Sequence, residues 1–354
     1  MSLKIRKKYL FYLVFGLTLV SLGLFVLKNQ RMGVLPSPRI QTVSSAPSET
    51  TSESAIGNSQ EYNKIKSVAD SDGVQAAWKY VIDTYGKDNA KQLEAHDYAH
   101  YVGGLIYEKL GLDGMSLCTS DFAFGCYHGL LDKAFRKDLT PLSAAEKACE
   151  KVGTSRSGPY ASCIHGIGHG IASFFKDKDL TQALKACDKL PEGAPQYCYD
   201  GVFMEFSNDA LDDFYKKNDP LFPCDAVTPE YIFACGRNQP TVLMKRFKFS
   251  FDQIYQACKT AKDKNLRTSC YVSLGFQSVY QSSEDPTQII TKCGAFKDSE
   301  FEYQCKSAAA GELVFQNINN WQTNSPMICN SITRSDQQKL CNDHITQIQK
   351  SYNR

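Results

Sequence analysis

Histidine and acidic side chains recur at two fixed positions along this chain, at a spacing that suits metal coordination. Five of the six histidines lie between residues 96 and 169. His96, His128, His165 and Asp200 follow one another at intervals of 32 to 37 residues. The position four residues further along holds, in the same order, His100, Asp132, His169 and Met204. Residues four apart share one face of a helix, so each interval would present a pair of side chains on the same side.

The same two positions hold few metal ligands further along the chain. They are occupied there by Arg237 and Thr241, Val272 and Phe276, Ser307 and Gly311, and Asp343 and Gln347. A packing rule would extend through all the intervals, whereas a binding site needs only some of them. The pattern therefore indicates a site in the N-terminal half of the series.

The predicted chemistry is coordination of a divalent transition metal. Zinc proteases present two histidines at positions i and i+4 of a helix in the same way. The cysteines form complete pairs and are expected to be oxidised, so nitrogen and oxygen ligands remain, which favour Zn, Fe, Mn or Cu(II). The predicted direct ligands are His96, His128, His165 and His169. The predicted further ligands, or partners that orient the rings, are His100, Asp132 and Asp200. Glu205, among apolar residues, is an additional candidate.

A metal at such a site could be catalytic rather than structural, because disulfides already hold the chain together. Zinc or iron with open coordination positions activates water or dioxygen, so a metal-dependent hydrolase or oxidase is the enzyme class that these ligands suit. The sequence selects neither reaction nor a substrate. Two alternatives remain open: a cluster that binds substrate or moves protons without metal, and histidines that only hydrogen-bond between helices.

Glycines accompany the predicted ligands. One follows directly after three of the ligand positions, at Gly129, Gly166 and Gly201. Glycine costs about 0.5–1 kcal/mol in a helix, so this repetition needs a reason, and we expect close approach of neighbouring helices. Gly168 and Gly170 flank His169 and are expected instead to open room for a substrate.

Seven regularly spaced pairs of cysteines define the elements that must position these side chains. The chain has 354 residues and 14 cysteines, and the second cysteines of the pairs are 35 to 37 residues apart. The pairs are Cys118 and Cys126, Cys149 and Cys163, Cys187 and Cys198, Cys224 and Cys235, Cys258 and Cys270, Cys293 and Cys305, and Cys329 and Cys341. Such a period is typical of a stack of small supersecondary units. We therefore predict an all-α alpha-solenoid of about eight antiparallel helical hairpins.

Each hairpin is predicted to carry one local disulfide. Ala and Leu recur at intervals of three and four residues before the first cysteine of a pair, and a loop with Gly and Pro precedes the second. The pattern predicts a short helix that ends at the first cysteine and a longer helix that begins at the second. A bridge between them should contribute roughly 2–3 kcal/mol. A hairpin without cysteines, at residues 74–85 and 90–110, is expected to precede the others.

The period and the cysteine placement over residues 118–354 resemble disulfide-bridged alpha-solenoids of the Sel1-like and tetratricopeptide type. The resemblance implies a curved helical scaffold with a face for a protein partner, and it implies no activity. The rival to a metal-dependent function is therefore a protein-interaction solenoid of the cell envelope, without metal or catalysis, in which the histidines are incidental.

The N-terminal segment predicts attachment to a membrane. Residues 1–8 are basic, and residues 9–27 form an uncharged run of 19, long enough to span a bilayer as an uncleaved signal anchor. Residues 28–61, which are rich in Ser, Thr and Pro from Val34 onwards, are expected to be a flexible tether to a repeat domain at residues 62–354. The basic flank places the N-terminus in the cytoplasm, and the paired cysteines place the repeat domain outside it. The net charge of +2 favours no nucleic-acid partner.

Overall fold

The computed structural model describes residues 60–86, 92–154, 157–175, 179–208 and 215–352 of the chain. Within these ranges the regular elements are fifteen α-helices and one 3₁₀ helix, and β-structure is limited to a single isolated bridge. The predicted all-α class is confirmed. The predicted basic tail, membrane segment and nearly all of the tether lie outside the described residues. No helix within the described ranges is long and apolar enough to cross a membrane.

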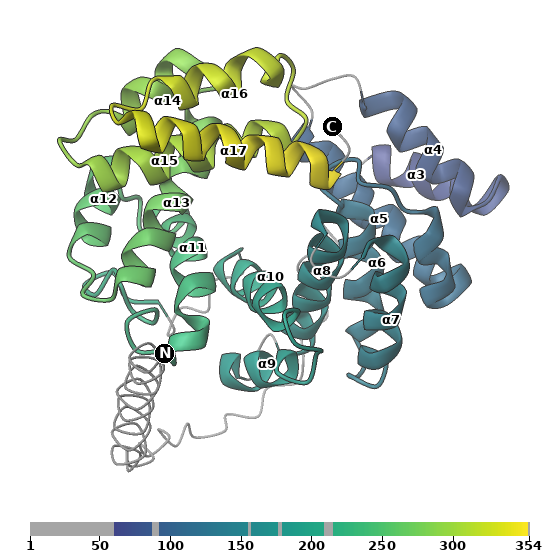
Figure 1. Cartoon of the computed structure of the whole chain (residues 1–354). Helices are drawn as coiled ribbons and strands as arrows, with labels where there is room; N and C mark the ends of the chain where they lie inside the picture. Colours follow the sequence, from purple (N-terminus) through teal and green to yellow (C-terminus); the bar gives the residue numbers. More distant parts are fainter. Residues whose placement is uncertain (1–59, 87–91, 155–156, 176–178, 209–214, 353–354) are drawn as a thin grey trace, which may run out of the picture. The chain divides into compact units, whose positions relative to one another are not determined.

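Long helices, one per repeat, pack side by side in chain order (Figure 1). They are α5 (Gln92–Leu110), α6 (Gly125–Phe135), α8 (Gly158–Phe175), α10 (Pro195–Asn208), α11 (Pro229–Lys245), α13 (Lys264–Gln281), α15 (Ser299–Phe315) and α17 (Ser335–Tyr352). Each contacts the next one in this series. Side chains at one position of consecutive repeats can therefore meet between neighbouring long helices.

Short elements precede most of the long helices. They are α3 (Gln60–Ser71), α4 (Val74–Tyr85), η2 (Gly111–Leu117), α7 (Leu142–Val152), α9 (Leu180–Cys187), α12 (Phe251–Lys259), α14 (Pro286–Cys293) and α16 (Trp321–Asn330). The bounds of α4 agree with the prediction, and α5 follows it as the expected longer partner. Helix α3 was not predicted, and its first two residues belong to the segment assigned to the tether.

All seven disulfides join the two cysteines that are nearest in sequence. The bridges are Cys118–Cys126, Cys149–Cys163, Cys187–Cys198, Cys224–Cys235, Cys258–Cys270, Cys293–Cys305 and Cys329–Cys341. Their Cα atoms are 5.3 to 5.7 Å apart, the usual separation for a disulfide. Each bridge fixes the start of a long helix. In α6 and α8 it therefore also fixes the position of the histidines that follow the second cysteine.

The seven long helices that contain the second cysteine of a pair start earlier than predicted, one to six residues before that cysteine. Aspartate caps explain two of these starts. Asp263 accepts hydrogen bonds from the backbone N–H groups of Asn265 and Leu266 at the start of α13, and Asp298 does the same at the start of α15. These carboxylates satisfy donors that the first turn leaves unpaired, so the helix begins where the cap stands.

Two of the expected hairpins lack an α-helical first arm, which corrects the prediction of eight uniform pairs. The segment before Cys118 is the 3₁₀ helix η2, which begins at Gly111 with a positive φ of 60°. The described residues before Cys224 form turns and contain Pro220 and Pro223. Proline has no backbone N–H to donate, and glycine weakens a helix, so neither segment sustains α-helical hydrogen bonding.

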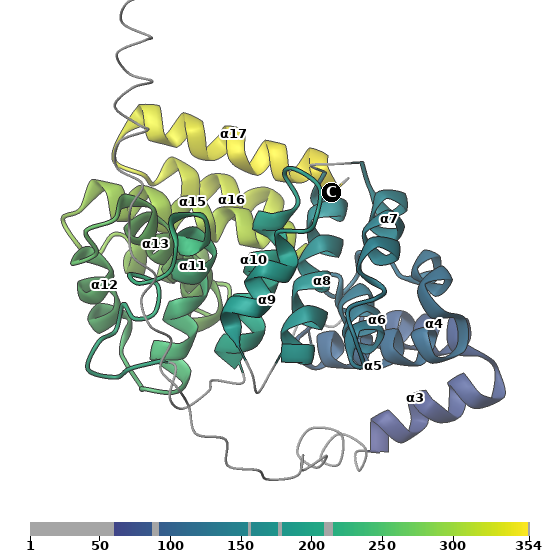
Figure 2. The same cartoon turned by 90° about the horizontal axis from the view of Figure 1, so that it is seen from below.

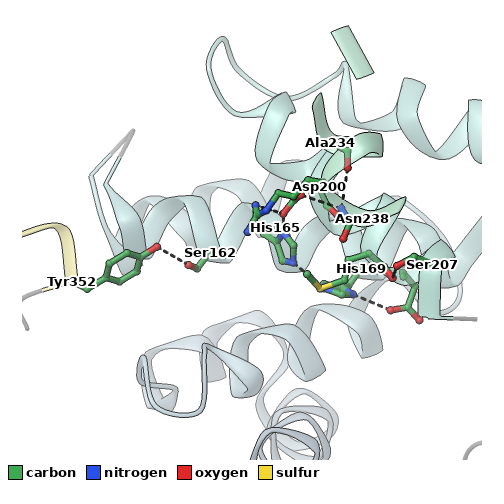
Figure 3. Close-up of polar contacts among 11 residues, drawn as sticks. Ser162, His165, His169, Asp200, Ser207, Ala234, Asn238 and Tyr352 are labelled. Carbon is green, nitrogen blue, oxygen red and sulfur yellow. Dashed lines mark hydrogen bonds and ion pairs between the residues drawn. The ribbon is translucent and has the colours of Figure 1, made fainter. Parts of the chain in front are cut away.

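The last helix returns to an earlier part of the described unit. Helix α17 contacts α8, and its end lies beside α8 in both views (Figures 1 and 2). The ring of Tyr352 lies 5.7 Å from that of Phe124 and 5.2 Å from that of Phe315. Its hydroxyl is 3.3 Å from the Ser162 hydroxyl on α8 (Figure 3). Helix α8, which carries His165 and His169, thus contacts α17 as well as its neighbours α6 and α10.

Candidate metal centre

Five of the six histidines form one continuous cluster across α5, α6 and α8. The ring centroids of His96 and His100 are 4.7 Å apart on α5, and those of His165 and His169 are 4.8 Å apart on α8. His128 of α6 lies between the two pairs, 5.5 Å from the His100 ring and 5.1 Å from the His169 ring. The regular register predicted from the sequence therefore brings these five side chains together.

Glycines permit the close helix packing on which the cluster depends. A Cβ atom added to Gly129 would lie 1.8 Å from the carbonyl oxygen of His100, and one added to Gly201 would lie 2.0 Å from that of His165. The prediction of close helix approach is confirmed.

The same contacts correct the interpretation of the two glycines beside His169. A Cβ atom at Gly168 would lie 2.2 Å from the carbonyl oxygen of Cys198, and one at Gly170 would lie 2.7 Å from that of Leu131. The neighbouring backbones of α10 and α6 fill this space. These glycines serve helix packing, and they do not open room for a substrate.

Three imidazoles are arranged so that they could share one ion. One ring nitrogen from each of His96, His100 and His128 lies within 4.8 Å of the other two. His96 Nδ1 lies 2.7 Å from the backbone carbonyl oxygen of Phe122. A carbonyl oxygen only accepts hydrogen bonds, so Nδ1 carries the proton and Nε2 keeps its lone pair for a ligand. The tautomer that this contact selects is the one that binds metal through Nε2.

His128 is buried without hydrogen-bond partners among the described residues. The residue is 7% exposed, and within the described part of the chain neither ring nitrogen has a hydrogen-bond partner. A buried polar group left without a partner costs about 1–3 kcal/mol. An ion on one of these nitrogens would remove that penalty. A histidine retained only for packing would be expected to form a hydrogen bond.

The two histidines of α8 are held by carboxylates of α10. His165 Nδ1 lies 3.1 Å from Asp200 Oδ2, and His169 Nδ1 lies 2.9 Å from Glu205 Oε2. Figure 3 shows His165 and Asp200 meeting between the helices. Metal-binding histidines commonly donate their second N–H to a carboxylate in this way, which fixes the ring orientation. Asp200 and Glu205 are therefore placed to position imidazoles.

Two residues of α11 that the sequence pattern did not predict hold the Asp200 carboxylate. Arg237 donates to Asp200 Oδ2 at 2.7 Å. Asn238 donates to Asp200 Oδ1 at 3.1 Å (Figure 3). Arg237 occupies the repeat position of His165 and Asp200, so the same register contained the signal. A search for metal ligands does not select Arg237, because a guanidinium cannot bind a metal cation.

Burial favours the neutral form of four imidazoles of the cluster. Loss of hydration lowers the pKa of His96 and of His165, and it lowers the pKa of His100 and of His128 well below the usual 6.5. Neighbouring imidazoles lower the pKa values of His100 and His128 further. At neutral pH these rings keep the lone pairs that coordination requires.

Asp200 remains ionised beside these neutral rings. Burial alone would raise its pKa, but the Arg237 guanidinium and the hydrogen bonds from His165 and Asn238 lower it to about 2. The carboxylate is thus available as an acceptor at any physiological pH.

The remaining predicted residues have other surroundings. Asp132 pairs with Arg136 of its own helix at 3.2 Å. His344, to which the sequence assigned no role, lies on α17 beside Gly311, away from the cluster. The structure thus brings the five histidines, Asp200 and Glu205 together and places Asp132 in a separate ion pair.

Comparison with known proteins identifies no relative. No protein-family model, curated protein or solved structure matches this chain. The arrangement of side chains is accordingly the basis for assigning a function.

Proposed function

We propose that this protein is a membrane-anchored, extracytoplasmic helical-repeat protein that binds a transition metal ion through His96, His100 and His128. The observation that carries the proposal is the state of His128, which is buried with both ring nitrogens unpartnered among the described residues. Native proteins rarely leave such groups unpaired without a functional reason. The ligating nitrogens of His96 and His100 lie within reach of the same ion.

The available ligand atoms, imidazole nitrogens without thiolates, restrict which metals the site would bind. Every cysteine is in a disulfide, so thiolate ligands are excluded and imidazoles provide the coordination. Imidazole nitrogen suits Zn, Cu(II) and Fe, and neutral rings held by burial favour binding at neutral pH. Three histidines leave further positions on the ion for water or substrate, which is the arrangement of catalytic rather than structural zinc sites.

The architecture and the location rest on other residues. Seven disulfides indicate an oxidising, extracytoplasmic environment. The uncharged run at residues 9–27 supports a single-pass anchor, and residues 28–61 would tether the helical unit to it. The serial contacts of the long helices support an alpha-solenoid of the Sel1-like or tetratricopeptide type.

Metal analysis of two leucine variants tests the proposal. The full-length protein, purified in detergent, would be loaded with Zn²⁺, dialysed and analysed for bound metal by mass spectrometry. His128→Leu should lose metal because leucine has no ligating atom. Leucine has a similar volume, so the packing around this position should be kept. His344→Leu removes a histidine outside the cluster and should retain the wild-type metal content. No metal in the wild type, or equal content in the two variants, would reject the function.

A further inference from the structure

The two histidines of α8 face each other in an arrangement that the three-histidine site does not explain. His165 Nε2 and His169 Nε2 are 3.0 Å apart. The opposite nitrogen of each ring, Nδ1, is occupied by a carboxylate, Asp200 for His165 and Glu205 for His169. Both rings are thus held so that the same two atoms converge.

The convergence of the two Nε2 atoms requires a proton or a metal ion between them. An ionised carboxylate only accepts hydrogen bonds, so both Nδ1 atoms carry the proton. In a neutral imidazole the other nitrogen is then a lone-pair acceptor. Two lone pairs at 3.0 Å repel each other, so the contact holds either a proton, which makes one ring an imidazolium, or a metal ion, which accepts both lone pairs.

The separation of the two nitrogens matches ligands on one transition metal. Histidine nitrogen binds zinc at about 2.0–2.1 Å, so two such ligands lie about 2.9 Å apart at a right angle and about 3.4 Å apart at a tetrahedral angle. The observed 3.0 Å falls within this interval. The carboxylates on Nδ1 are the partners that metal-bound histidines commonly have.

His128 connects this pair to the first three-histidine site. Its ring lies 5.8 and 5.5 Å from the rings of His96 and His100, and 5.4 and 5.1 Å from those of His165 and His169. Both of its nitrogens lack a partner among the described residues. One ion would satisfy one nitrogen, whereas two ions, one on each side, satisfy both.

We propose that the cluster is a dinuclear metal centre, with one ion held by His96, His100 and His128 and a second held by His165 and His169. The proposal rests on the proposed function and extends it. The His128 ring lies between the ions and gives one nitrogen to each, releasing its single N–H proton to solvent. Asp200 and Glu205 act as positioning residues for the second ion.

Ion counting on the full-length protein tests the second site. Native mass spectrometry during titration with Zn²⁺ should show two ions per wild-type chain. The double variant His165→Leu/His169→Leu should keep one ion, and the matched double variant His96→Leu/His100→Leu should also keep one. Circular dichroism would establish that each variant is folded.

Each outcome separates the two proposals. One ion in the wild type that the His165→Leu/His169→Leu protein retains would overturn the dinuclear centre and leave the proposed function standing. A folded His165→Leu/His169→Leu protein without any ion would indicate a single shared site and would also overturn it. No ion in the wild type would reject both proposals.

A milder substitution covers the case in which the double variants do not fold. Glu205→Gln keeps the shape of a side chain that is 26% exposed and still offers an acceptor to His169 Nδ1. Its neutral amide makes the imidazole a weaker ligand. The affinity for the second ion should fall about 10- to 100-fold, with the first unchanged. Equal affinities for both ions in this variant and the wild type would contradict the assignment.

Discussion

His165 and Asp200 belong to neighbouring long helices and occupy the same position of consecutive repeats, and their side chains meet at 3.1 Å. A residue that recurs at one repeat position usually forms the same contact in every repeat. Here the recurring position supplies an imidazole in one repeat, a carboxylate in the next and the guanidinium of Arg237 in the one after. The register thus builds a row of complementary charges and donors that leads to the cluster.

Replacement of His128 by leucine should leave the metal-free protein as stable as the wild type, or more stable. The substitution removes two buried nitrogens that lack partners in the described structure and keeps most of the side-chain volume. Urea denaturation in the presence of a chelator measures this. Ile164→Ala, a truncation of a fully buried side chain on α8, is the control and should cost about 2–5 kcal/mol. A loss of similar size for His128→Leu would indicate a structural histidine.

Removing the charge of Arg237 should destabilise the protein more than removing that of Asp200. The Arg237 side chain is 35% exposed, whereas that of Asp200 is 9% exposed. Arg237→Met leaves a buried carboxylate with only His165 and Asn238 as donors, at a cost of about 2–3 kcal/mol. Asp200→Asn leaves a guanidinium that can reach water. Equal free energies of unfolding for the two variants would show that the pair is not buried in solution.

The metal-free protein should lose stability as the pH falls below about 6.5. Burial lowers the pKa values of His96, His100, His128 and His165 in the folded state. The unfolded chain therefore binds protons at pH values where the folded chain does not, and acidification favours unfolding. Between its folded and unfolded pKa values, each such histidine lowers the free energy of unfolding by about 1.4 kcal/mol for each pH unit of acidification. Above the unfolded pKa its full contribution to stability is present.

Thermal unfolding with a chelator, between pH 8 and pH 5, measures this dependence. His128→Leu should reduce the slope, because one lowered pKa is removed, and His100→Leu should do the same. A stability that does not change between pH 7.5 and pH 5.5 would contradict burial of the cluster in the metal-free state.

The disulfides should map as seven local bridges. Digestion without reduction should release peptides that link Cys149 to Cys163 and each of the other cysteines to its nearest partner. Replacing both Cys149 and Cys163 with serine should cost about 2–3 kcal/mol, because their bridge closes a short loop at the start of α8. A majority of links between different repeats would refute the hairpin arrangement.

Tyr352 should stabilise the contact between α17 and α8 through its ring. Tyr352→Ala removes aromatic contacts with Phe124 and Phe315 and should cost about 3 kcal/mol. Tyr352→Phe removes only the 3.3 Å hydroxyl contact with Ser162 and should cost less than about 1 kcal/mol. Denaturation midpoints compare the two variants. Equal effects would show that the C-terminal end of α17 does not pack on α8 in solution.

The sequence by itself determined the repeat unit and most of the histidine cluster. Cysteines at intervals of 35 to 37 residues predicted the local bridges, because a bridge over a short loop needs only the two arms that flank it. The same interval placed His96, His128 and His165 at one repeat position. Side chains at one position of neighbouring helices must lie near each other, so the five-histidine cluster followed from counting residues.

The tertiary structure decided which atoms meet. The helix crossing angles and the side-chain rotamers set whether a side chain contacts the next helix or a residue of its own helix. The repeat period of the sequence specifies neither of them. Asp132 turns to Arg136, while Glu205, off the repeat position, reaches His169. Gly168 packs against the backbone of α10 and does not border a substrate cavity. The contact of Tyr352 with α8 joins residues 190 apart in sequence, and no repeat period predicts such a contact.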